Sequence, residues 1–294
     1  MGVNKISLGL VVGLGYRDAT LSVHHLLQQV KTHPFFNKIV SGGERIAWGA
    51  KTIPEGGYYA VPERLFVPGA LIVGDGAGLV NVPALKGIHY AMGSGMIAAD
   101  TLFAALSEGR DLACAEVGSH YDAAIRQSFI MNDLYRVRNM RQGFDHGFIP
   151  GVFLAGLMTL TGGAFPKGPF KTQADRDKPI FIGDKIYPKP DGQTIFDKLS
   201  SVHLSGNKTR DDQPSHLHLP TAVSDPMATA WVNMCPANVY EKGVAEAAST
   251  VAGGAAPHFL RVNPTNCVQC GAIGATGGQL TPPEGGSGPE YKET

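Results

Sequence analysis

The chain has 294 residues, of which 43% are hydrophobic and 17% are charged, and its 25 acidic side chains balance 25 basic ones. The length suits one large domain or two to three small ones, and the balanced charge argues against general nucleic-acid binding. Four cysteines at these spacings do not suggest a secreted disulfide framework, so a reduced compartment with a metal site is the better interpretation.

The N-terminal region predicts a strand followed by a helix. It lacks the features of a signal peptide. Ile6–Leu14 is a β-rich run, so the chain starts almost inside a strand. We expect a missing segment upstream; the alternative is that this strand is simply the first element. Gly13–Asp18 has an aspartate where a dinucleotide fingerprint needs its third glycine, which favours a turn. Leu21–Val30 has helical periodicity. Its neighbours His24 and His25 point to different sides of a helix, which is poor metal geometry.

A strand, a glycine turn and a helix follow one another from residue 70. Ala70–Val73 is an apolar run without alternation, as expected for a strand buried on both faces. Gly74–Gly78 forms the turn, and Lys86–Leu106 suits a buried helix. In open α/β folds ligands bind beyond the carboxyl ends of strands, where the Asp75 carboxylate and the free N–H groups of the next helix would lie. An ordinary tight turn is the alternative.

A second long helix is predicted over Ser119–Gln142, and an uncharged segment follows it. Gly147–Pro166 contains no charged residue and has basic residues on both sides. It carries too few apolar residues in sequence to cross a bilayer. The pattern favours a segment that dips into one leaflet with its basic flanks at the headgroups, and a buried core helix is the alternative.

The last third of the chain carries three cysteines in a metal-binding pattern. Cys267 and Cys270 are separated by two residues, and Cys235 is followed by proline, as is the last cysteine of many bacterial ferredoxins. Soft thiolates select zinc or iron–sulfur centres. The residues alone leave open an iron–sulfur cluster, unliganded cysteines, or a Cys3His zinc site completed by one of three histidines, namely His216, His218 or His258. Small strands are predicted over Ala237–Glu241 and His258–Val262.

Several motifs, in this order along the whole chain, resemble the electron-transfer flavoprotein–ubiquinone oxidoreductase family. They are Leu8–Leu14, Glu55-Gly56-Gly57, Asn81-Val82-Pro83, Lys86-Gly87, Tyr187–Gly192, Asp212-Gln213-Pro214, Cys235-Pro236-Ala237, Asn266-Cys267-Val268 and Pro283–Gly286. The resemblance covers about the C-terminal half of such an enzyme.

The resemblance implies an α+β fold: part of a glutathione-reductase-type FAD domain and a quinone/substrate domain, then a small ferredoxin-like iron–sulfur domain. The corresponding ranges are 1–68 for part of the quinone/substrate domain, 69–146 for the C-terminal part of the FAD domain, 147–171 for a membrane-dipping segment, and 172–294 for the iron–sulfur domain. The implied activity is electron transfer from reduced electron-transfer flavoprotein to ubiquinone through FAD and a 4Fe-4S cluster.

The resemblance also implies the sites and the location. The implied cluster ligands are Cys235, Cys267 and Cys270. The implied FAD contacts are Gly74, Asp75, Gly76, Gly78, Asn81, Lys86 and Gly87. The implied partners are electron-transfer flavoprotein, ubiquinone and one face of a membrane, with no nucleic acid. We expect a peripheral or monotopic protein on an energy-transducing membrane, either the mitochondrial inner membrane or a bacterial cytoplasmic membrane.

Two departures from the family pattern bear on activity. The Gly-x-Gly-x-x-Gly cradle for the ADP part of FAD is absent, and Ile273 stands at the spacing of a further cluster cysteine. Ile273 implies that the cluster is lost, that it has three thiolates and a labile iron, or that the copy is defective. Two rival interpretations remain: a non-enzymatic membrane-associated fragment with a structural zinc site, and a nonfunctional relic.

Overall fold

The computed structural model describes residues 4–170, 173–210, 212–219, 223–243, 260–281 and 287–291. The chain forms two compact units. Residues 53–172 make up what we call the helical unit, and residues 1–52 together with 173–294 make up the cysteine unit. The described strands pair as three two-stranded antiparallel sheets among many helices. The α+β prediction is confirmed at this level.

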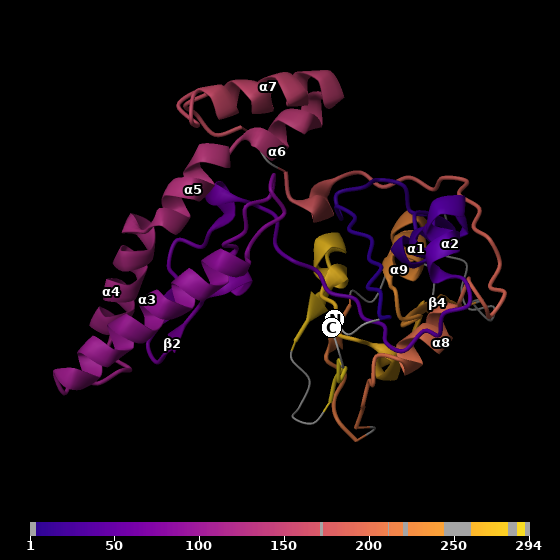
Figure 1. Cartoon of the computed structure of the whole chain (residues 1–294). Helices are drawn as coiled ribbons and strands as arrows, with labels where there is room; N and C mark the ends of the chain where they lie inside the picture. The colour runs from indigo at the N-terminus through magenta and orange to yellow at the C-terminus, as the bar shows by residue number, and fades with distance from the viewer. Residues whose placement is uncertain are drawn as a thin grey trace, which may run out of the picture. The chain divides into compact units, whose positions relative to one another are not determined.

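The helical unit is built around helix α3 and the helices that follow it (Figure 1). Figure 1 shows α3 and α4 running side by side, with the β1–β2 hairpin next to them. The elements are η1 (Tyr58–Ala60), β1 (Phe66–Val67), β2 (Ala70–Leu71), η2 (Gly74–Ala77), α3 (Ile88–Ser107), α4 (Ala115–Gln127), α5 (Phe129–Val137), α6 (Met140–Gly143), η3 (Phe144–His146) and α7 (Phe148–Leu160).

The core of the helical unit lies where α4 and α5 face α3 and the hairpin. Tyr121 and Ile125 are one helical turn apart on α4 and are both fully buried. The Tyr121 hydroxyl donates to the carbonyl of Ile72 at 2.9 Å, which ties α4 to the hairpin. The apolar burial of α4 and this hydrogen bond together fix the segment that leads into the Gly74 turn.

Helix α7 packs on α6 and η3 through two glycines. A Cβ on Gly143 would lie 2.6 Å from the Leu154 side chain, and one on Gly151 would overlap the Phe144 ring. Only glycine at these positions lets the backbones approach this closely. No helix in the described ranges is long and apolar enough to cross a bilayer.

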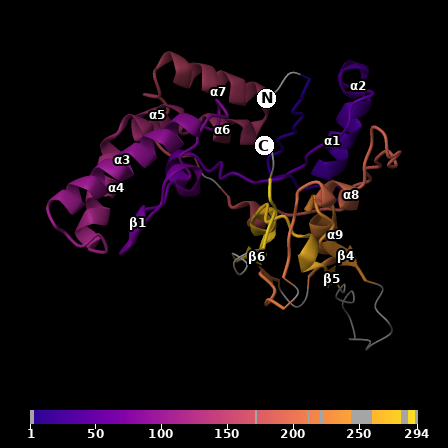
Figure 2. The same cartoon turned by 60° about the horizontal axis from the view of Figure 1, so that its bottom comes forward.

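The cysteine unit combines the N-terminal helices with the C-terminal strands (Figure 2). Figure 2 shows β4 and β5 side by side near α9. The elements are α1 (Val23–Thr32), α2 (Pro34–Val40), η4 (Asp175–Asp177), α8 (Lys198–His203), β3 (Leu217–His218), α9 (Asp225–Met234), β4 (Tyr240–Lys242), β5 (Leu260–Val262), η5 (Pro264–Asn266), η6 (Ala272–Thr276) and β6 (Gln279–Leu280).

Helix α1 is attached to the unit by polar side chains. His24 and Gln28, one turn apart, are its buried residues. The His24 Nε2 lies 2.9 Å from the Phe196 carbonyl, and the Phe196 N–H donates to Gln28 Oε1 at 3.0 Å. The two side chains therefore satisfy both backbone groups of one residue, as a neighbouring strand would.

Two strand predictions were wrong. Ile6–Leu14 forms no strand, and its apolar side chains Ile6 and Val11 are exposed, because no described edge pairs with its backbone. Ala70–Val73 is not buried on both faces: β2 is a two-residue hairpin strand, and Ile72 and Val73 are exposed.

The predicted helix over 119–142 is broken at Ser128. This residue leaves the helical conformation, and its hydroxyl accepts from the N–H of Ile130 and so caps α5. Serine competes with the backbone for hydrogen bonds in this way, which makes it a good N-cap and a poor interior residue.

The predicted strands around the cysteines are confirmed with shifted ends, as β4 and β5. Their register pairs Tyr240 with Val262. His258 and the motif Pro283–Gly286 lie outside the described residues.

Candidate functional site

The three C-terminal cysteines stand at the ends of short elements. Cys235 caps α9, Cys267 follows η5, and Cys270 comes just before η6. The N–H of Asn263 donates to the carbonyl of Val239 at 2.7 Å and extends the β4–β5 pairing. This pairing brings the chain around Cys235 next to the chain around Cys267.

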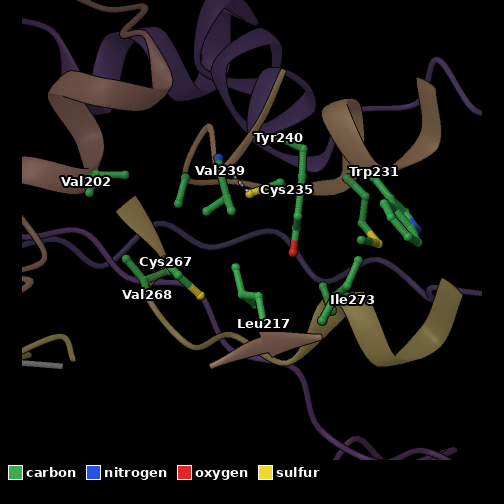
Figure 3. Packing of buried hydrophobic residues seen from close by; sticks show 12 residues of the cluster. Val202, Leu217, Trp231, Cys235, Val239, Tyr240, Cys267, Val268 and Ile273 are labelled. Atoms are coloured by element: carbon green, nitrogen blue, oxygen red, sulfur yellow. Dashed lines mark hydrogen bonds between the residues drawn. The ribbon is translucent and has the colours of Figure 1, made fainter. Parts of the chain in front are cut away.

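All three thiols line one cavity, which we call the cysteine cavity. The non-atom space inside it is about 330 Å³, a figure that includes the open solvent at its mouth. Its walls are Leu217, Met234, Cys235, Pro236, Ala237, Val239, Tyr240, Cys267, Val268, Cys270, Gly271, Ala272, Ile273 and Leu280. Figure 3 shows the sulfurs of Cys235 and Cys267 on opposite sides of a space into which the Tyr240 hydroxyl also points.

Backbone N–H groups point at two of the sulfur atoms. The N–H of Val239 donates to Sγ of Cys235 and the N–H of Gln269 to Sγ of Cys267, each at 3.4 Å. Hydrogen bonds to sulfur stabilise thiolates and tune the potentials of iron–sulfur clusters. The same two N–H groups could donate to a thiolate sulfur at these positions.

Burial opposes ionisation of the free thiols. It raises the pKa of Cys267 to about 12 and that of Cys270 to about 11, and it also raises the pKa of Cys235. The thiols therefore carry their protons at neutral pH until a metal displaces them. Metal uptake here releases protons and depends on pH.

Two polar side chains close to the cysteines were not singled out in the sequence. Tyr240 is buried, and burial together with the three neighbouring thiols raises the pKa of its hydroxyl, which stays protonated. Lys198 is 8% exposed. Its ammonium donates to the carbonyl of Val232 at 2.8 Å and interacts electrostatically with Cys235. A cation so close to a thiol has no local sequence signature, because α8 is brought there by tertiary packing.

The metal-binding side chains of the cavity are its three thiols. The described residues contain no group of three or more His, Cys, Asp or Glu side chains close enough to hold one metal ion. His216 and His218 are absent from the cavity wall, and His218 instead meets Thr281 Oγ1 at 3.2 Å. Three thiols that line one cavity are the ligand type of an iron–sulfur cluster, whose irons each take one thiolate.

The glycine turn after β2 is the second candidate site. Gly74 is buried with φ +63°, and a Cβ there would lie 3.2 Å from Cβ of Ala91 on α3, so the turn needs glycine. The Gly74 N–H donates to the Ser94 hydroxyl at 2.9 Å, which fixes η2 against the beginning of α3. Asp75, Gly76 and Gly78 follow, and the Asp75 side chain is exposed.

The remaining residues of this site lie between the turn and α3. Asn81 and Lys86 pair their backbones through two hydrogen bonds of 2.8 and 3.1 Å and close a tight loop. The loop delivers the chain to Gly87, the N-cap of α3, which has no side chain to cap the helix. All seven predicted residues therefore gather around the beginning of α3, whose first N–H groups and positive dipole end can receive an anionic or polar group.

Comparisons with known proteins match both ends of the chain. Residues 1–53 match the family model "ETF-QO, ubiquinone-binding", and residues 192–292 match "Electron transfer flavoprotein-ubiquinone oxidoreductase, 4Fe-4S". The mitochondrial electron transfer flavoprotein-ubiquinone oxidoreductase of Oryza sativa subsp. japonica is 36% identical over 98% of this chain and 50% of the relative.

The proteins with the same name from Caenorhabditis elegans and Homo sapiens are 36% and 37% identical, each over 99% of this chain. The chain belongs to the electron transfer flavoprotein–ubiquinone oxidoreductase family. It spans about half the length of the curated relatives that it matches, a span consistent with their C-terminal half.

Both family models fall almost entirely within the cysteine unit. The matched residues 1–53 and 192–292 belong to the unit formed by residues 1–52 and 173–294. The part that matches the family's ubiquinone-binding model is thus folded together with the part that matches its 4Fe-4S model. The helical unit, with the glycine turn and α7, lies between the two matched regions in the sequence.

Proposed function

We propose that this chain takes part in membrane-associated electron transfer from reduced electron-transfer flavoprotein to ubiquinone, through FAD and an iron–sulfur cluster. The observation that carries the proposal is the cysteine cavity. Three buried thiols line it and two of them receive backbone N–H bonds, within the residues that match the family's 4Fe-4S model.

Cys235, Cys267 and Cys270 would hold the cluster. When bound, the cluster supplies one-electron chemistry; the protein's part is to fix it, keep water away and set its potential through burial and hydrogen bonds. The Tyr240 hydroxyl and the N–H groups of Val239 and Gln269 would donate to sulfur, and the apolar walls would exclude water.

FAD would lie against the glycine turn. We assign residues 69–146 to the C-terminal part of a glutathione-reductase-type FAD domain, in which Gly74, Gly76 and Gly78 allow close approach of the ligand. Asp75 would accept from a hydroxyl of the ribityl chain. Asn81, Lys86 and Gly87 would hold the loop that presents the N-terminus of α3. Support comes from the left-handed Gly74, the Ser94 contact and the uncapped helix end.

Two regions of the chain would contact the quinone and the membrane, respectively. Residues 1–68 would contribute to the quinone/substrate domain, as the ubiquinone-binding match over 1–53 supports. Residues 147–171 would dip into one leaflet. Support comes from the apolar side chains that α7 leaves exposed, which are Phe148, Ile149, Val152, Phe153 and Leu160.

Residues 172–294 would form the ferredoxin-like iron–sulfur domain. The protein would lie on the mitochondrial inner membrane, because the relatives compared above carry the word mitochondrial in their names. The match of residues 192–292 to the family's 4Fe-4S model favours a cluster over the rival fragment with a structural zinc site.

An anaerobic visible and EPR spectrum of the purified full chain, with iron and acid-labile sulfide assays, tests the proposal. We expect a broad absorption shoulder with comparable amounts of iron and sulfide. Cys235→Ser should abolish both, whereas Cys114→Ser, in the helical unit, should leave them unchanged. Zinc in place of iron, or no metal after reconstitution, would contradict the proposal.

A further inference from the structure

Ile273 occupies a wall of the cysteine cavity at the position where a cluster ligand is expected. It follows Cys270 by three residues, as Cys270 follows Cys267. Its side chain is 4% exposed and lines the same cavity as the three thiols. A 4Fe-4S cluster is ordinarily held by four cysteines, and an isoleucine side chain offers iron no ligand atom.

The packing around Ile273 fits an apolar residue in this place. A Cβ on Gly278 would lie 2.5 Å from Cγ1 of Ile273, so the glycine makes room for the isoleucine. The backbone also turns back here, since the Gly278 N–H donates to the Ile273 carbonyl at 3.2 Å. The Ile273 side chain is therefore packed into the cavity wall.

No other described side chain replaces the missing thiolate. The fourth cysteine of the chain, Cys114, belongs to the helical unit, where its sulfur accepts from the N–H of Glu116 and caps α4. Apart from the three thiols, the cavity wall offers the Met234 thioether and the Tyr240 hydroxyl. A neutral thioether and a neutral phenol are much weaker ligands for iron in a sulfide cluster than a thiolate is.

We propose that the cysteine cavity holds its cluster through three thiolates, so that the iron beside Ile273 has no protein ligand and is exchangeable. This inference rests on the proposed function and deepens it. Cys235, Cys267 and Cys270 fix three irons, and the Ile273 side chain in the wall offers the fourth iron no ligand atom.

The exchange step is a one-electron oxidation with loss of one ion. A four-iron cluster of core charge 2+ releases Fe²⁺ and one electron and leaves a three-iron, four-sulfide core of charge 1+. The bonds between the leaving iron and its three sulfides break, the three Fe–thiolate bonds remain, and no proton moves. A one-electron oxidant such as ferricyanide accepts the electron. Added Fe²⁺ and one electron from dithionite reverse the step.

The test compares the full chain with two variants at the same residue. Each protein is reconstituted anaerobically, treated with ferricyanide, desalted, and assayed for iron, sulfide and the EPR signal of an oxidised three-iron cluster. We expect the natural chain to lose about one iron per cluster while retaining its sulfide, and to recover its iron with Fe²⁺ and dithionite. Ile273→Cys should keep its iron, and Ile273→Val should behave like the natural chain.

Three results would overturn the inference. If the natural chain keeps all its iron and stays EPR-silent, a fourth ligand exists. Equal iron loss from Ile273→Cys and the natural chain would show that lability has another cause. Failure of every protein to take up iron and sulfide would overturn the proposed function as well, and so is distinct from the first two results.

Discussion

Arg138 donates from Nη1 to the carbonyl of Gly163, 2.7 Å away and 25 residues further along the chain. The same guanidinium donates to the carbonyls of Tyr135 and Pro166 at 2.7 and 2.9 Å, and it stacks on the Tyr135 ring. Arg138 is 2% exposed. One buried cation thus ties the end of α5 to the turn that follows α7, and we expect this contact to hold α7 in place.

Replacing Arg138 with methionine should destabilise the helical unit. The buried Gly163 carbonyl would lose its donor, which costs about 1–3 kcal/mol. The half-buried Pro166 carbonyl would keep only the Asn139 amide, at 3.5 Å. Urea unfolding followed by circular dichroism measures the loss. Arg138→Lys should recover part of it, since lysine can satisfy one carbonyl. Equal unfolding free energies for Arg138→Met and the natural chain would contradict this role.

The sequence predicted the three cysteines of the cysteine cavity but not the polar side chains beside them. Cys235, Cys267 and Cys270 are recognisable because their chemistry depends on residue type and spacing. Lys198 and Tyr240 were missed, because their places at the cavity come from the packing of α8 and the pairing of β4 with β5, which leave no local pattern.

The elements of the helical unit were predicted with mixed success. The prediction of α3 over 86–106 is close to the observed Ile88–Ser107, but the expected burial is wrong for the face that carries Met92, Met96 and Phe103, which is exposed. The composition of such a helix shows that it is apolar but does not predict which of its faces packs against other elements. The break at Ser128 was missed, although a serine within a long helical pattern is a common N-cap.

Protonation of His24 should weaken the fold in acid. Burial lowers the pKa of His24 to about 4 from its usual value of 6.5, and its Nδ1 has no hydrogen-bond partner in the described structure. Between these values the unfolded chain binds more protons than the folded chain, so stability falls as the pH drops from about 6.5 to about 4. Unfolding midpoints at pH 7 and pH 5 measure this loss.

His24→Gln should flatten this pH dependence, because glutamine can still bond the Phe196 carbonyl but does not titrate in this range. His33→Gln is the control, since that side chain is exposed and caps α2. An unchanged pH slope in His24→Gln would show that other groups cause the acid sensitivity.

Charge on the exposed face of α7 should weaken binding to lipid vesicles. Phe153 is 73% exposed, and burying such a ring in a leaflet contributes about 1.5–3 kcal/mol. Phe153→Glu should therefore lower binding at least tenfold in flotation assays with phospholipid vesicles. Phe103→Glu, at a side chain on α3 that is 72% exposed, is the matched control and should have little effect. Equal losses in the two variants would rule out α7 as the membrane contact.

Flavin uptake should depend on a polypeptide that supplies the dinucleotide cradle. The sequence contains no Gly-x-Gly-x-x-Gly motif, and the aligned relatives have a further half that this chain does not span. We expect much less than one FAD per chain in the purified chain. The flavin content should rise when the N-terminal half of the rice relative is co-expressed.

We expect the exposed apolar face of α3 to contact the co-expressed N-terminal half of the rice relative. Met96→Glu, on this face, should therefore reduce the flavin gained on co-expression. Leu160→Glu, on α7, is the control and should not reduce it. The absorbance ratio of flavin to protein measures both variants. Stoichiometric flavin in the chain purified by itself would contradict the prediction that flavin uptake needs a second polypeptide.

The buried ammonium of Lys198 should raise the reduction potential of a cluster in the cysteine cavity. Reduction adds a negative charge next to Cys235, and a cation in a poorly hydrated site stabilises that charge more strongly than one in water. Lys198→Met should therefore shift the potential to a more negative value in an EPR-monitored redox titration.

Lys51→Met is the matched control. Lys51 lies near Cys270 and donates to the Gln269 carbonyl at 3.3 Å. Unlike Lys198, it is exposed, so solvent screens its charge. Its shift should be clearly smaller. An equal or larger shift in Lys51→Met would mean that burial of Lys198 gives it no special influence on the site.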